Sequence, residues 1–172
     1  MKISYLLFIV VIVLGTYLTF TAWAILQGNT DSVCNFWPDA DCLEAKFELL
    51  TTLQKRQLLS TVHLDYCYLI FYPLLLGIWV YREMQAQASV LGNIFFRFCL
   101  LVVVVLFFSD ITENILLGYA LQDISYPFKT LALVTRLKWI SFAFILLSLL
   151  IGVMGRKTGL FPLSLRLKNR IE

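Results

Sequence analysis

The sequence predicts an all-α integral membrane protein, folded as an antiparallel bundle of four transmembrane helices. Of its 172 residues, 60% are hydrophobic and only 15% are charged, a composition far outside that of soluble domains. Apolar stretches of about 20 residues, the length that crosses a bilayer core, recur at residues 5–26, 61–81, 94–120 and 134–154. These stretches lack the alternation of a strand, so helices rather than a barrel are expected to pair their backbone polar groups.

The first stretch has a second interpretation, because Lys2, an apolar run and the "AWA" at residues 22–24 also resemble a cleavable signal peptide. The apolar core of a signal peptide is about 7–15 residues long, and the run at residues 5–26 is longer. We therefore expect a retained transmembrane helix. The chain then forms one four-helix domain that covers residues 1–172.

Basic residues predict the orientation of the bundle. The segment 156–172, here called the basic tail, contains Lys and Arg at several positions and a single acidic residue, Glu172. Because basic residues in short segments favour the cytoplasmic side, we expect the basic tail and the N-terminus in the cytoplasm. The first loop, residues 27–60, is then extracytoplasmic.

The first loop is predicted to be closed by a disulfide and to be partly helical. Cys34 and Cys42 flank the short sequence "NFWPDAD" on the side predicted to be oxidising, where a structural disulfide is expected. Cys67 and Cys99 are single residues in apolar helices, which is typical of buried inert thiols. Apolar residues at helical spacing in 43–60 predict an amphipathic helix that lies on the outer membrane surface or caps the bundle.

Charged residues of three predicted spans lie at one depth. Asp65 and Lys138 are each about four residues, or roughly 6 Å at 1.5 Å per residue, from the outer ends of their spans. The span that runs outward carries further carboxyl groups in its final third. Because a charge at mid-membrane costs about 2.5–3.5 kcal/mol or more, these residues should face the bundle interior, together with polar residues on the same helix faces. The predicted ligand-binding or proton-handling residues are Asp65, Tyr68, Tyr72, Asp110, Glu113, Asn114 and Lys138.

The charges in this predicted cluster do not balance. Three carboxyl groups face two cations, Arg136 and Lys138, if Arg136 belongs to the cluster. The remaining carboxyl group then holds a proton, or His63 is protonated, or a cation completes the site. An ion-pair network that only holds the helices in register is an equally open interpretation.

A metal site is a further hypothesis, because imidazole nitrogen and carboxylate oxygen are suitable ligands. The sequence contains no recognised metal-binding spacing to support it. The residues of this hypothetical site are His63, Asp65, Asp110 and Glu113.

Three classes of function follow from these features. The first is a non-enzymatic membrane protein whose outer-leaflet polar pocket binds a lipid headgroup, a quinone-like molecule or a cation, either alone or as an accessory subunit. The second is a membrane-embedded enzyme that uses a carboxyl group in acid–base chemistry or on metal-bound water. The third is an ion-coupled transporter, which would have to oligomerise to form a path. The expected partners are membrane lipids, copies of the chain or a larger membrane complex; no cofactor is indicated, and no nucleic-acid-binding surface is visible.

Overall fold

A computed structural model describes the backbone of residues 2–26, 37–87, 89–125 and 127–157. Within these residues the protein is all-α and contains five helices and no strand. The helices are α1 (Lys2–Ile25), α3 (Ala40–Glu48), α4 (Thr52–Ala86), α5 (Val90–Leu121) and α6 (Phe128–Lys157).

Four of these helices confirm the predicted set of long apolar segments. The segments Tyr5–Ile25, Thr52–Ala86, Val90–Leu121 and Phe128–Gly155 are each long and apolar enough to cross a membrane. Helix α4 has 35 residues, and its length of about 52 Å at 1.5 Å per residue exceeds a hydrocarbon core of about 30 Å. The first turns of α4 therefore extend beyond the predicted span.

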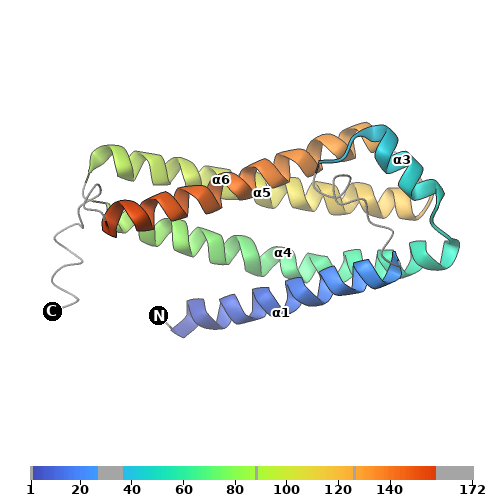
Figure 1. Cartoon of the computed structure of the whole chain (residues 1–172), viewed down its shortest axis with the longest axis horizontal. Coiled ribbons are helices and arrows are strands. Elements are labelled where there is room, and N and C mark those ends of the chain that lie inside the picture. Colours follow the sequence, from blue (N-terminus) through green and yellow to red (C-terminus); the bar gives the residue numbers. More distant parts are fainter. Residues whose placement is uncertain (1, 27–36, 88, 126, 158–172) are drawn as a thin grey trace.

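Successive long helices run in opposite directions, so α1 begins and α6 ends at the same end of the bundle (Figure 1). Helix α3 lies at the opposite end, which we call the loop end. Helices α4, α5 and α6 pack against one another, and α1 packs along α4. No extensive interface joins α1 to α6, so α1 is held mainly by α4.

The interior beyond the loop end is mainly apolar, although Glu83 and Ser148 are also buried there. Buried side chains of α4, α5 and α6 form one continuous cluster there, and α1 approaches it closely where a Cβ at Gly15 would lie only 3.2 Å from the Tyr68 hydroxyl. The cluster consists of Leu69, Tyr72, Leu76, Val80, Met84, Phe96, Cys99, Val103, Leu106 and Ile145.

The prediction of one helix over residues 43–60 is wrong. Helix α3 ends at Glu48, and a new helix begins at Thr52. The Thr51 side chain accepts a hydrogen bond from Gln54 N at 3.3 Å, and Gln54 Oε1 accepts one from Thr51 N at 3.0 Å. This reciprocal capping box starts a separate helix, so residues 52–60 extend the spanning helix α4. Of the segment 43–60, α3 covers the loop end, through its buried residues Leu43 and Phe47.

The disulfide prediction is not supported by the described residues, because Cys34 lies outside them and Cys42 alone is described. Cys67 and Cys99 are free thiols, as predicted. Cys99 is buried, whereas Cys67 is exposed on the bundle surface. Most of the basic tail also lies outside the described residues, so the orientation of the bundle stays a prediction.

Candidate functional site

Helix α5 buries two carboxyl groups and an amide on one face. Asp110, Glu113 and Asn114 are only 5%, 8% and 3% exposed. Their spacing of three and four residues places them on one helical stripe, and this stripe contacts side chains of α4 and α6. The predicted inward orientation of Asp110 and Glu113 is therefore confirmed.

Lys138 of α6 is the cation of this cluster. Its Nζ lies 3.3 Å from Asp110 Oδ1 and also forms an ion pair with Glu113 Oε2. The Lys138 side chain is 19% exposed, so the three groups are largely removed from solvent. Because removal of either charge would leave its partner buried and uncompensated, Lys138 binds α6 to α5 at this depth.

Hydroxyl groups complete the shell of the two carboxylates. The Tyr72 hydroxyl on α4 donates to Asp110 Oδ2, and Thr135 Oγ1 on α6 donates to Glu113 Oε1 at 2.8 Å. Each carboxylate thus has Lys138 and one hydroxyl as partners. Thr135 is not among the residues predicted from the sequence, although its position three residues before Lys138 places it on the same helix face.

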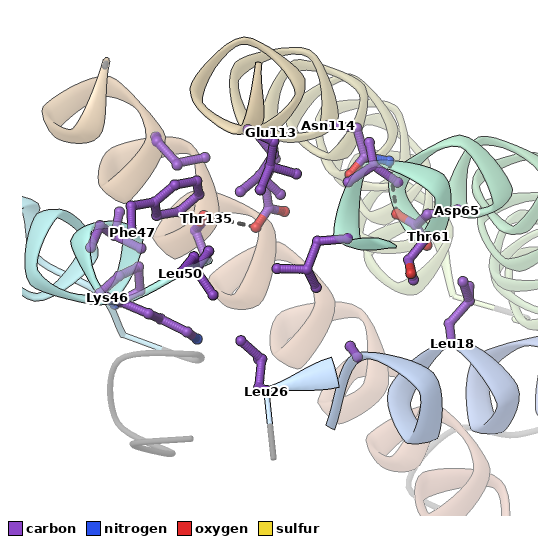
Figure 2. A pocket seen from close by; sticks show the side chains of 18 of the residues that line it. Leu18, Leu26, Lys46, Phe47, Leu50, Thr61, Asp65, Glu113, Asn114 and Thr135 are labelled. Atoms are coloured by element: carbon purple, nitrogen blue, oxygen red, sulfur yellow. Dashed lines mark hydrogen bonds between the residues drawn. The ribbon is translucent and has the colours of Figure 1, made fainter. Parts of the chain in front are cut away.

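Asp65 of α4 has a different environment. Its Oδ2 accepts a hydrogen bond from Asn114 Nδ2 at 2.7 Å (Figure 2), and it forms no ion pair with any described residue. Tyr68 stacks on Tyr72 with ring centroids 4.9 Å apart, so it contributes its ring to this region. Asp65 is thus the carboxyl group of the cluster that has no cationic partner in the described part of the chain.

Two residues considered in the charge count lie elsewhere. Arg136 Nε donates to the carbonyl oxygen of Pro38 at 2.7 Å, and its guanidinium lies 5.5 Å from the centroid of the Trp37 ring. Arg136 therefore attaches the segment before α3 to α6. His63 is exposed on α4. Among the described residues, the cluster therefore has three carboxyl groups and one cation. The excess of carboxyl groups over cations is larger than the sequence predicted.

The predicted metal set is not assembled. In the part of the chain that the structure describes, no three His, Cys, Asp or Glu side chains are arranged to hold a metal ion. His63 is on an exposed face, and the Lys138 ammonium pairs with both Asp110 and Glu113. The lysine thus takes the place that a metal ion would need between these two carboxylates.

A pocket of about 360 Å³ adjoins the cluster at the loop end. Its polar side is formed by α4, α5 and α6, and its other walls are mainly leucines of α1, α3 and the long helices. Lys46 extends from α3 toward the space between the helices (Figure 2). The polar residues that line the pocket on the long helices are Thr19, Thr61, Asp65, Glu113, Asn114, Thr135 and Lys138.

A second cavity adjoins the pocket along α1. Thr19 lines both this pocket and a shallower groove of about 630 Å³, which runs beside α1 and is bordered on α4 by Tyr68. The other groove residues extend from Val11 to Trp23, within the apolar segment of α1. The pocket at the loop end and an apolar groove along α1 thus adjoin each other at Thr19.

No protein-family model matches the chain, and neither a curated protein nor a solved structure matches it significantly.

Proposed function

We propose that this chain is a small integral membrane protein that binds an amphiphilic, lipid-like molecule at the loop end. The polar head of the ligand lies in the pocket against Asp65 and Asn114, and its apolar tail lies in the groove beside α1. The observation that carries this proposal is that the pocket and the groove lie next to each other at Thr19, which lines both. A volume of about 360 Å³ with apolar walls and a few convergent polar groups is typical of small-molecule sites.

The dimensions of the path support a ligand from the membrane. Val11 of α1 and Leu26, which directly follows α1, bound the groove and the pocket. They are separated by about 22 Å at 1.5 Å per residue. One leaflet contributes about half of a hydrocarbon core of about 30 Å. A molecule with its head at the loop end would therefore place its tail within one leaflet. The lack of an extensive interface between α1 and α6 favours entry from the side.

The same geometry favours binding over transport. The buried cluster of α4, α5 and α6 beyond the polar site consists mainly of apolar side chains, and apolar side chains provide no ligands for an ion. An enzyme is favoured less than a binding protein because Asp110 and Glu113 are both held by Lys138 and a hydroxyl. Groups that are so fully paired are poorly placed to exchange protons with a substrate.

Native mass spectrometry after mild detergent extraction tests the proposal. We expect one amphiphile for each chain in the wild type. Ala22 lines the pocket, so Ala22→Phe should fill the space and remove the ligand. Ala143 is exposed on α6, and Ala143→Phe adds the same side chain outside the pocket. Equal ligand occupancy in the two variants, or no ligand in the wild type, would overturn the proposal.

We also propose that the loop end is extracytoplasmic, that the basic tail is cytoplasmic and that Cys34 and Cys42 form a disulfide. The charge distribution supports the orientation, and an oxidising compartment supports the disulfide. A bridge from Cys34 to Cys42 would restrain the segment that Arg136 attaches to α6 through Pro38. Because Pro38 lines the pocket, this restraint would hold that wall of the pocket in place.

A further inference from the structure

We infer that the polar head of the bound amphiphile is a positively charged amine and that it pairs with Asp65. This inference rests on the proposed function, because it names the chemistry of the ligand that the pocket holds. It concerns one feature of the pocket, the Asp65 carboxyl group, which forms no ion pair with a described residue.

The charge distribution is the first argument. Lys138 pairs with Asp110 and with Glu113, so one ammonium already serves two carboxylates. Arg136 is directed to Pro38 and Trp37. No ion pair among the described residues therefore includes Asp65. A carboxylate that is partly buried and forms no ion pair is costly, and a ligand cation would relieve that cost.

The position of Asp65 is the second argument. One of its oxygens accepts from Asn114, and the residue lines the pocket, where a ligand can reach it (Figure 2). Lys46 lines the same pocket but forms no ion pair with Asp65. The amide of Asn114 orients the carboxylate, and its second oxygen has no hydrogen bond from a described residue.

An amine fits this place better than a metal ion. A primary ammonium has three donors, and Asp65 and the Thr61 hydroxyl, one helical turn apart on α4, both line the pocket as acceptors. Hard metal ions require more oxygen ligands than these, usually six or more. The surrounding leucines suit the alkyl part of an amphiphile and not a hydrated ion.

Two sources share this chemistry, namely a single-chain alkylamine and a diacyl lipid with an ethanolamine headgroup. We would titrate delipidated protein with dodecylamine and dodecanol, which have the same tail, and count bound molecules by native mass spectrometry. The amine should bind at least about ten-fold more tightly, as a hydrogen bond to a charged group implies. Nanodiscs with phosphatidylethanolamine or phosphatidylglycerol then distinguish the sources, since enrichment of the former identifies a diacyl ligand.

Variants of Asp65 locate the effect. Asp65→Asn should remove the preference for dodecylamine and leave dodecanol binding unchanged, whereas Asp65→Glu should restore part of the preference. Equal binding of amine and alcohol to the wild type would overturn the amine inference and leave the amphiphile pocket standing. If neither compound binds, the proposed function itself fails. If Asp65→Asn does not fold, the comparison of dodecylamine with dodecanol binding to the wild type still tests the amine inference.

Discussion

Replacing Lys138 with Met removes the cation between Asp110 and Glu113 and keeps most of the length of the side chain. The two carboxylates are only 7% and 10% exposed at their side chains, so water cannot readily replace the lysine. Breaking a buried pair typically costs about 3–5 kcal/mol, against about 0–1 kcal/mol for a surface pair. One carboxyl group can take up a proton in the variant, so we expect about 3 kcal/mol, the lower end of the range.

Reversible unfolding in detergent micelles measures this loss. Lys129 is an exposed lysine near the start of the same helix, so Lys129→Met is the matched control and should leave the free energy of unfolding nearly unchanged. Glu113→Gln provides a double-mutant cycle with Lys138→Met. Because the two residues form an ion pair, the double variant should lose less than the sum of the single losses, by about 0.5–3 kcal/mol.

Two results would refute this reasoning. If Lys138→Met is as stable as Lys129→Met, the lysine does not compensate buried carboxylates. If the losses from Lys138→Met and Glu113→Gln are additive, the two side chains do not interact in the folded protein. Either result would rule out a stabilising ion pair between α5 and α6.

Three further predictions address the hydroxyl contact, the disulfide and the orientation. Tyr72→Phe removes the donor to Asp110 and should lower the free energy of unfolding by about 1.5–3 kcal/mol. Tyr68→Phe removes a hydroxyl without such a contact and should change the free energy of unfolding little. Equal losses in the two variants would contradict the hydrogen bond from Tyr72 to Asp110. Alkylation of the folded protein without reductant should leave Cys34 and Cys42 unmodified and bonded to each other in peptide maps; a labelled Cys34 would exclude the disulfide. Protease added to intact cells should cleave the first loop and spare the basic tail, and the reverse pattern would invert the proposed orientation.

The location of the polar cluster could be predicted from the sequence because a membrane limits the choices. Carboxyl groups on α5 need partners at their own depth, and counting residues from the span ends identified Lys138 as one. Helical spacing then placed Asp110, Glu113 and Asn114 on one face, which the structure confirms. Depth and facing depend on helix geometry alone, so they can be read from one sequence.

The pairing within the cluster could not be predicted in the same way. Residue spacing does not decide that Tyr72 donates to Asp110, or that Arg136 reaches back to Pro38, since both contacts depend on how separate helices rotate and tilt against one another. The break after Glu48 was in principle visible as the "TTLQ" capping box. It was missed because the apolar spacing of residues 43–60 continues through the break. The pocket arises from the packing of five helices, and no local pattern encodes it.

The sequence left open whether the polar cluster stabilises the bundle or binds a ligand. The structure favours both roles, each carried by different residues of the cluster. Asp110 and Glu113 are held by Lys138 and by hydroxyls from two helices, so they should determine stability. Asp65 is oriented by Asn114 and faces the pocket, so it should determine ligand preference. Asp110→Asn and Asp65→Asn each replace a carboxylate with an amide, and of the two residues only Asp65 lines the pocket. We expect the first variant to lower the free energy of unfolding with little change in the ratio of amine to alcohol binding. The second variant should lower that ratio and leave the free energy of unfolding nearly unchanged. A cluster that only held the helices in register would show a loss of stability in both variants and no change in that ratio.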